Sequence, residues 1–305
     1  MNYMTPKEAS VLWGISERMV RMYCAEGRIP SAKQEGDTWC IPKGTHKPKR
    51  KPKTIEPKVN LSPLVKRIIY QRTKNNHYGI YEYLQVNLAY SSNRMASNRL
   101  TRNEVEEVYR TNKISTSFEP VKIDDVIETI NHFSAVRYMI DNVGSPLSQA
   151  FAKKIHFLLT YGTYADRKEK IQSGEYRTST SAMGIPHREI NDSLAELIKN
   201  YEKQPANLER ILEFHARFEL IHPFDDYNGR VGRIIMMKEC LRHGVEPFII
   251  DDKHRGEYNR GIKMWESNHT ILTAVAEHAQ LRFRTKKEIC DMLEYSRPMT
   301  GRGAR

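Results

Sequence analysis

Two segments with helical periodicity flank the stretch His222-Pro223-Phe224-Asp225-Asp226-Tyr227-Asn228-Gly229-Arg230-Val231-Gly232-Arg233. Residues 207–221 before it and 231–241 after it repeat apolar side chains at three- and four-residue steps. Glycines just before a helix let backbone N–H groups approach an anion, and the start of the helix adds a partial positive charge. The sequence therefore predicts a loop-to-helix corner that is suited to a phosphate.

This corner collects the residue types that phosphoryl or nucleotidyl transfer needs. Arginine matches phosphate oxygens through several donors at once, and a neighbouring carboxylate can hold Mg²⁺. His222 can accept a proton near neutral pH and is the candidate general base. The alternative is a plain turn at a helix end, which does not need so many phosphate-compatible groups. The pattern favours group transfer over hydrolysis by a nucleophilic side chain.

The same stretch resembles the signature of Fic-domain proteins, His-x-Phe-x-(Asp/Glu)-Gly-Asn-Gly-Arg-x-x-Arg. Tyr227 stands where the family usually has glycine. A bulky side chain at this position could change how the nucleotide binds, so the group that is transferred stays open. The positions that agree with the pattern are His222, Phe224, Asp226, Asn228, Gly229, Arg230 and Arg233.

The resemblance implies a protein adenylyltransferase that moves AMP from ATP to a Ser, Thr or Tyr hydroxyl of a target protein and also modifies itself. By that resemblance His222 takes the hydroxyl proton and Asp226 holds Mg²⁺ between the phosphates. Family members often line the base with paired tyrosines, and Asn259 replaces the second of them here. The expected nucleotide-binding residues are Tyr227, Asn228, Gly229, Arg230, Val231, Gly232, Arg233, Tyr258 and Asn259.

A second local match precedes the core. In Fic proteins whose inhibitory helix comes first, the pattern Ser-x-x-x-Glu-(Gly/Asn) places a glutamate against the last arginine of the signature, here Arg233. Ser92 matches the serine, but Ala96 occupies the glutamate position, as a natural or an engineered residue. A carboxylate competes with phosphate for an arginine, whereas a methyl group does not. We therefore expect this autoinhibition to be relieved.

Residues 173–186 differ in character from the helical segments around them. Threonines and an aromatic residue between glycines favour a short strand pair. The segment resembles the β-hairpin flap with which Fic proteins pair an extended target segment, and an ordinary surface hairpin is the alternative. The candidate target-binding residues are Arg177, Thr178, Ser179 and Thr180.

The first 45 residues carry the signals of a separate small domain. Residues 5–8 form a capping box with proline at the first helical position, a second helix follows Ser16, and a hairpin turn lies at Glu35-Gly36. This layout resembles the winged helix-turn-helix heads of MerR and excisionase type. Arg18 and Arg21 on the second helix are the candidate DNA-binding residues. A vestigial or protein-docking module is the alternative.

The net charge of +12 is unevenly spread. Residues 1–42 carry five basic and five acidic side chains, whereas residues 43–58 carry seven basic and one acidic. Prolines among these lysines predict a stiff linker. Such a linker would add salt-dependent phosphate contacts if DNA is the partner, or would serve only as a solubilising tether.

The expected organisation is mainly α: a Fic helical bundle core with a short β-hairpin flap, plus a small N-terminal winged helix-turn-helix domain. The four cysteines are scattered and no long apolar run exists, so we expect a cytoplasmic protein that is not membrane-bound. A homodimer is an expectation from family analogy. The expected segments are a head at 1–45, a basic Pro/Lys linker at 46–60, a helical region with the degenerate inhibitory motif at 61–122, the Fic core at 123–285, and a C-terminal helix end and tail at 286–305.

Other functions stay open at this point. A phosphotransferase variant of the Fic fold would follow if Tyr227 changes how the nucleotide sits. A DNA-binding regulator could sense the nucleotide without turnover. Removal of AMP from proteins depends on the inhibitory glutamate in relatives, so Ala96 argues against it. His132, His156 and His215 lack neighbours at ligand spacing, which favours packing roles over metal binding.

Overall fold

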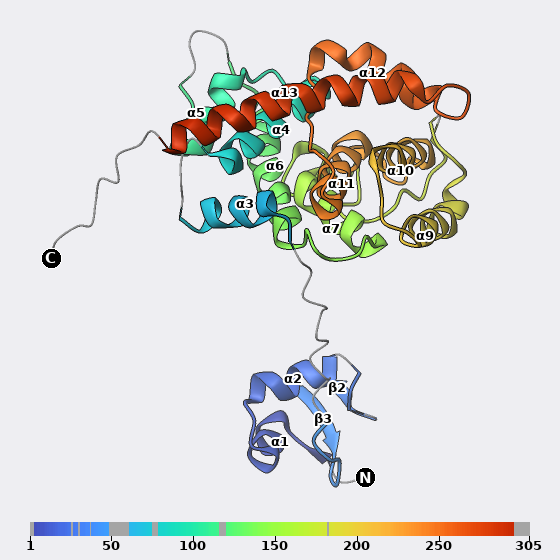
Figure 1. Cartoon of the computed structure of the whole chain (residues 1–305). Coiled ribbons are helices and arrows are strands. Elements are labelled where there is room, and N and C mark those ends of the chain that lie inside the picture. The colour runs from blue at the N-terminus through green and yellow to red at the C-terminus, as the bar shows by residue number, and fades with distance from the viewer. Residues whose placement is uncertain are drawn as a thin grey trace, which may run out of the picture. The chain divides into compact units, whose positions relative to one another are not determined.

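The computed structural model describes residues 3–25, 27–29, 31–36, 38–48, 61–74, 79–115, 120–181 and 183–295. Residues 293–295 are described by their backbone only. The chain divides into two compact units, Met1–Val59 and Asn60–Arg305 (Figure 1). Most of the predicted linker (49–60) and the predicted tail from residue 296 lie outside the described residues.

The first unit combines two short helices with a small antiparallel sheet of strand order β1-β3-β2. Its elements are β1 Tyr3–Met4, α1 Pro6–Trp13, α2 Glu17–Ala25, β2 Lys33–Glu35 and β3 Thr38–Pro42. The register pairs Met4 with Ile41 and Gln34 with Trp39. Ala9, Val20 and Ile41 are fully buried between the helices and the sheet. These are the two helices and the hairpin that the sequence predicts.

Local signals set the ends of α1. The Thr5 hydroxyl accepts from the Glu8 backbone N–H at 3.3 Å, and a Glu8 carboxylate oxygen accepts from the Thr5 N–H at 2.7 Å. This reciprocal pair satisfies two of the donors that a helix start leaves free. Gly14 ends the helix in the left-handed region (φ 60°), where glycine has no steric cost. The predicted capping box is confirmed.

The second unit is helical, which confirms the mainly α prediction for this part of the chain. Its elements are α3 Pro63–Thr73, α4 Ile80–Arg94, α5 Arg102–Thr111, α6 Ile123–Asp141, α7 Gln149–Thr160, α8 Tyr164–Arg167, η1 His187–Glu189, α9 Ile190–Tyr201, α10 Leu208–Ile221, α11 Asn228–His243, η2 Asp252–His254, α12 Arg255–Lys263 and α13 Thr270–Tyr295.

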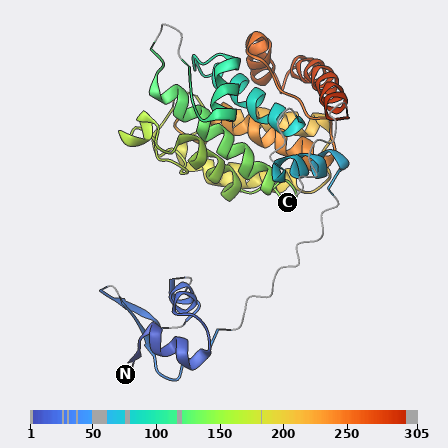
Figure 2. The ribbon, with the colours of Figure 1, turned by 90° about the vertical axis from the view of Figure 1, so that its left-hand side faces the viewer.

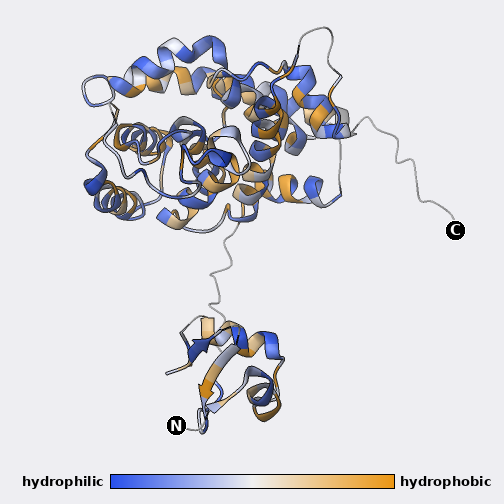
Figure 3. Cartoon of the chain, turned by 180° about the vertical axis from the view of Figure 1, so that it is seen from behind, coloured by the Kyte–Doolittle hydropathy of each residue, from blue (hydrophilic) through white to orange (hydrophobic). Residues whose placement is uncertain are grey.

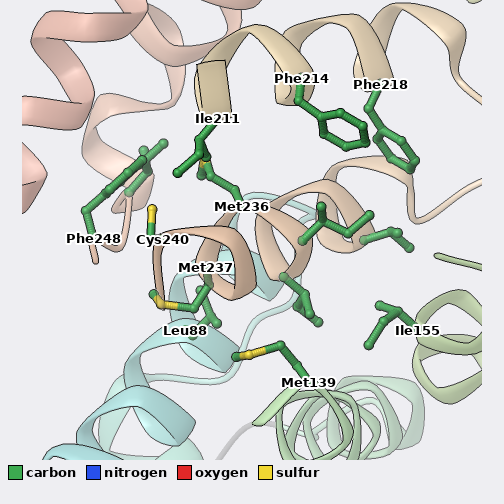
Figure 4. Packing of buried hydrophobic residues seen from close by; sticks show 14 of the residues in the cluster. Leu88, Met139, Ile155, Ile211, Phe214, Phe218, Met236, Met237, Cys240 and Phe248 are labelled. Carbon is green, nitrogen blue, oxygen red and sulfur yellow. The ribbon is translucent and has the colours of Figure 1, made fainter. Parts of the chain in front are cut away.

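Helix α11 is the centre of the second unit. It contacts α4, α6, α7 and α10, and nearly all of its residues are buried. Figure 4 shows side chains from these neighbours meeting around α11, with Met236 on the side of α10 and Met237 on the side of α4. Because α11 begins at the end of the signature stretch, its burial fixes that stretch relative to four other helices.

The outer helices bury one face. Hydrophilic and hydrophobic residues alternate along most helices of the second unit (Figure 3). Helix α13 packs on α10 and α12 and runs along the outside of the bundle (Figures 1 and 2). It starts at Thr270, and its buried positions Leu272, Ala276, Ala279 and Phe283 keep helical spacing. No helix among the described residues has the length and apolarity to cross a membrane.

The prediction of a β-hairpin at residues 173–186 is wrong, because this segment does not form strand-to-strand hydrogen bonds among its described residues. No strand is present in this segment, residue 182 aside, which is not described. The segment bonds instead to the turn after α10, from the Arg177 N–H to the Pro223 carbonyl at 3.0 Å and from the Ile185 N–H to the Ile221 carbonyl at 3.4 Å. Its backbone donors therefore fix it beside His222.

Candidate active site

The end of α10 positions His222. Its backbone adopts the left-handed region (φ 51°, ψ 62°) and its N–H donates to the Phe218 carbonyl at 3.1 Å. Pro223 follows and cannot supply the next helical hydrogen bond. The helix therefore stops at Ile221, and the imidazole of His222 lines a cavity.

Arg177 holds this turn from outside the signature. Its Nε donates to the His222 carbonyl at 2.7 Å and one terminal nitrogen donates to the Ser179 carbonyl at 2.9 Å. A further bond reaches the Ile185 carbonyl. With 2 % of its surface exposed, Arg177 is a buried clamp on the main chain. Target binding by this flap stays a prediction. Thr178, Ser179 and Thr180 are exposed.

The loop between His222 and α11 is closed by Asn228. The Asn228 side chain accepts from the Phe224 N–H at 2.9 Å and donates to the Phe224 carbonyl at 2.8 Å. The Phe224 ring stacks on the His156 ring with centroids 4.0 Å apart, and His156 Nδ1 accepts from the Gly174 N–H at 2.9 Å. Asn228 and His156 therefore shape the loop, and His156 has the packing role that its lack of ligand spacing predicts.

Tyr227 occupies the glycine position of the signature with a left-handed backbone (φ 65°). A side chain there costs about 1–2 kcal/mol. Its hydroxyl donates to Glu128 of α6 at 2.7 Å, and the Arg230 guanidinium lies 3.3 Å from the centre of its ring. A hydrogen bond and a cation–π contact of this kind offset that cost. The phenol ring is thus part of the wall and is 5 % exposed.

Arg233 meets the helix that carries the predicted inhibitory motif. Its Nε donates to the Ser92 hydroxyl at 3.0 Å and a terminal nitrogen donates to the Ser92 carbonyl at 3.1 Å. Ala96 lies in the turn that follows α4, four residues after Ser92, and lines the same cavity as Arg233. Both partners of the guanidinium at Ser92 are uncharged, so its positive charge is not neutralised by them.

These residues surround a cavity of about 180 Å³ between α4, α10, α11 and α12. The lining residues are Met95, Ala96, Glu219, His222, Asp226, Tyr227, Asn228, Gly229, Arg230, Arg233, Arg255, Tyr258 and Asn259. Val231 and Gly232, which we expected to bind the nucleotide, do not line it. Val231 is fully buried in the core, and its N–H bonds to the Tyr227 carbonyl at 2.9 Å. The predicted nucleotide residues are otherwise brought together.

Gly232 faces α10 at very short range. A Cβ at this position would lie 2.6 Å from Glu219 Oε1 and 2.8 Å from His215 Cε1. His215 Nε2 in turn lies 2.5 Å from the Tyr258 hydroxyl, and the two rings are stacked. Tyr258 lines the cavity but is only 2 % exposed, whereas Asn259 lines it and is exposed.

Burial sets the protonation of two lining groups. Burial lowers the pKa of His222, so its imidazole is neutral at pH 7 and can accept a proton. Burial raises the pKa of Glu219 to about 7, although the Arg233 charge opposes the shift. Glu219 Oε1 is enclosed without a hydrogen-bond partner among the described residues. The cavity thus holds one neutral base and one carboxyl that is readily protonated.

Asp226 is the carboxylate that fits Mg²⁺. Its side chain is 65 % exposed, and one oxygen accepts from the Tyr227 N–H at 2.6 Å. The described residues contain no group of three or more His, Cys, Asp or Glu side chains arranged for a metal. Mg²⁺ in phosphate-transferring sites takes one or two carboxylates and fills its remaining positions with water and substrate phosphates, which a single exposed aspartate allows.

Glu128 and Glu219 were not among the predicted site residues, and Arg177 was predicted for a different role. Glu128 is 99 residues from Tyr227 in the chain, and no local pattern links the two. Glu219 lies in the helix that the apolar period of residues 207–221 predicts, but no sequence pattern marks it as part of the site. Arg177 was predicted as part of the flap, but no local pattern around it indicates that its side chain is buried.

Residues 146–240 match the model of the Fic/DOC family. The protein adenylyltransferase Fic of Aedes aegypti is 31% identical over 99 residues, 30% of this chain and 20% of that protein. The uridine 5'-monophosphate transferase of Xanthomonas campestris is 31% identical over 90 residues, 27% of this chain and 17% of that protein. The chain thus spans about a fifth of the length of the curated relatives that it matches.

Solved structures show the same fold. A Fic-domain signaling protein from Bacteroides thetaiotaomicron aligns with a TM-score of 0.59 at 15% identity, over 78% of this chain and 99% of that one. Fic-1 from C. elegans aligns with a TM-score of 0.59 at 18% identity, over 76% of this chain and 73% of that one. The resemblance of the signature to Fic-domain proteins is confirmed at the level of the matched region and the fold.

Proposed function

We propose that this chain is a nucleotidyltransferase that moves AMP from Mg-ATP to a Ser, Thr or Tyr hydroxyl of a protein. The observation that carries the proposal is the convergence on one cavity of neutral His222, exposed Asp226, Arg233 and the start of α11. The match of residues 146–240 to the Fic/DOC family and the names of the curated relatives support the same reaction class.

In the proposed reaction the target hydroxyl gives its proton to His222 and attacks the α-phosphorus. A new phosphorus–oxygen bond forms to the hydroxyl as the bond to the pyrophosphate oxygen breaks, and pyrophosphate leaves. The first N–H groups of α11, at Asn228, Gly229 and Arg230, lack earlier helical partners and can donate to phosphate oxygens. Fixed donors of this kind stabilise the charge that develops during phosphoryl transfer.

Mg²⁺ bound at Asp226 would supply positive charge between phosphate oxygens. Arg233 would add a second positive charge from the opposite side. Because Ala96 cannot pair with Arg233 as a glutamate would, we propose that the chain works without that autoinhibitory contact. Self-modification at an exposed hydroxyl belongs to the same proposal.

The labelling test uses nucleotide labelled at either the α- or the γ-phosphate, with the full chain, Mg²⁺ and host lysate. AMP transfer predicts protein-bound label from α-labelled ATP and none from γ-labelled ATP. Replacing His222 by alanine should abolish the label, whereas His187→Ala, an exposed histidine outside the cavity, should not. Label from the γ position would instead support the phosphotransferase alternative and overturn this proposal.

The nucleotide is tested in the same experiment. Because one curated relative is named as a uridine monophosphate transferase, α-labelled UTP, GTP and CTP are run beside ATP. The proposal expects ATP to give the strongest label. Strong transfer from UTP alone would support nucleotidyl transfer but show that the nucleotide is a uridine and not an adenosine nucleotide.

A second candidate function concerns the first unit, which has its own buried core. We propose that it is a winged helix-turn-helix head that binds DNA through α2. Arg18 is exposed on that helix, and Arg21 is exposed while paired with Glu17 at 2.8 Å. Band shifts on genomic DNA fragments should weaken on Arg18→Ala with Arg21→Ala and persist with Lys7→Ala. Equal band shifts for all variants would show that α2 does not contact the DNA.

A further inference from the structure

Arg230 is already occupied by the protein. Its NH1 lies 3.0 Å from Glu128 Oε1, and its guanidinium lies flat on the Tyr227 ring. The side chain is 5 % exposed and that of Glu128 is 15 % exposed. Removing one member of such a buried pair leaves the other charge uncompensated, which is strongly unfavourable. Arg230 therefore stays with Glu128, and its positive charge is largely neutralised.

Glu128 is itself fixed from three directions. Besides its ion pair with Arg230, Glu128 accepts hydrogen bonds from the Tyr227 hydroxyl at 2.7 Å and from the Asn98 side chain at 3.2 Å. Asn98 also donates to the Asp125 carbonyl at 3.0 Å, so it is anchored to the same helix. A carboxylate held by this many donors cannot swing away to release the arginine for a phosphate.

Arg255 also lines the cavity, and it has no ion pair with a carboxylate among the described residues. It begins α12, is exposed, and lines the cavity beside Tyr258 and Asn259. Among the described residues no carboxylate lies within ion-pair distance of its guanidinium, whereas Arg94 pairs with Asp252 nearby at 3.9 Å. An unpaired guanidinium at a cavity rim has all of its donors available for phosphate oxygens.

We infer that Arg255 is a polyphosphate-binding residue of this site, and that Glu128 turns Arg230 from a phosphate ligand into a positioning residue. The inference rests on the proposed function and names which cations meet the phosphates. Arg233 and Arg255 face the polyphosphate from two different helices, α11 and α12. Arg230 instead holds Tyr227 and the start of α11 in place.

The test measures equilibrium binding, so that turnover does not enter. The parent is the full chain with His222→Ala in Mg²⁺ buffer, and the probes are ATP, AMP and inorganic tripolyphosphate, titrated by calorimetry. On this parent, Arg255→Gln should weaken ATP and tripolyphosphate binding about 10- to 100-fold, the range of one lost charge-assisted contact. AMP binding should change less than about threefold, since AMP lacks the outer phosphates.

A matched control and a second variant keep the inference falsifiable. Arg260→Gln removes the same charge from an exposed position of α12 outside the cavity and should leave all three affinities unchanged. Glu128→Gln keeps an acceptor for the Tyr227 hydroxyl but frees Arg230, and should tighten ATP binding by about tenfold.

The outcomes separate the two proposals. If Arg255→Gln binds ATP as well as Arg260→Gln does, or if Glu128→Gln weakens ATP binding, the inference is overturned while nucleotide binding by the parent still supports the proposed function. If the parent binds none of the three probes, the proposed function fails and the inference fails with it.

Discussion

Replacing Ala96 by glutamate would return a carboxylate to the side of the cavity that Arg233 occupies. Ser92 already holds Arg233 through Nε and one terminal nitrogen, at 3.0 and 3.1 Å. Position 96 lies in the turn after α4, four residues beyond Ser92, and lines the cavity with the arginine. A glutamate there would therefore reach the guanidinium donors that Ser92 leaves free, and these are the donors that a triphosphate needs.

The size of the effect follows from the exposure of the site. A hydrogen bond to a charged group contributes about 1.5–3 kcal/mol when it is well buried. Position 96 is exposed, so solvent screening reduces the competition to about 1–2 kcal/mol. That free energy corresponds to an affinity for Mg-ATP that is about 5- to 30-fold weaker. Calorimetric titration of the His222→Ala parent with and without Ala96→Glu measures it.

Ala96→Gln is the matched control, because glutamine has the same size and no charge. We expect it to change the ATP affinity less than about threefold, as a neutral side chain competes weakly for a guanidinium. Equal weakening by Ala96→Glu and Ala96→Gln would mean that bulk, and not charge, acts at this position. No weakening by either would refute the assignment of Arg233 as a phosphate ligand.

Three further predictions concern packing, a buried charge and pH. Gly232→Ala should lower the free energy of unfolding by about 1–3 kcal/mol, because a Cβ would lie 2.6 Å from a carboxyl oxygen of α10. Gly256→Ala has open space around its Cβ and should raise the free energy of unfolding by up to about 1 kcal/mol. Denaturant titrations that give both variants the same shift would contradict the close approach at Gly232. Lys238 is fully buried and pairs with Glu239 at 2.6 Å, and Glu239 also has Arg242 at 3.2 Å. Lys238→Met should therefore cost about 1–3 kcal/mol in the same assay, the cost of leaving buried acceptors short of one donor, and a cost near zero would show that the pair is dispensable. Because burial lowers the pKa of His222, the base form persists as the pH falls, and the acidic limb of the label-transfer rate should have its midpoint below about pH 6.5, the usual value for histidine; a midpoint above that value would exclude this histidine as the base.

The local geometry of the chain was largely readable from the sequence. The Thr5 capping box and the helix predicted at residues 207–221 depend on local sequence, and each was found where the pattern placed it. The signature also predicted the loop-to-helix corner. Helix α11 nevertheless begins at Asn228, three residues before the predicted start, since polar and glycine residues there obscure the apolar period.

The long-range partners were not readable. Nothing near Tyr227 indicates that Glu128 accepts its hydroxyl, and a strand propensity at 173–186 does not reveal that the backbone donors of this segment go to Pro223. Arg177 illustrates the same limit, because an arginine between threonines reads as exposed until the turn that it clamps is in place. Propensity acts locally, whereas these contacts depend on how distant helices pack.

The most direct test of the account is a crystal structure of the His222→Ala chain with Mg²⁺ and a non-hydrolysable ATP analogue. We predict electron density for the triphosphate in the cavity between α10, α11 and α12, with Mg²⁺ at Asp226 and the outer phosphates within hydrogen-bond distance of Arg233. A cavity that stays empty at saturating analogue, or a nucleotide bound elsewhere on the chain, would contradict the account.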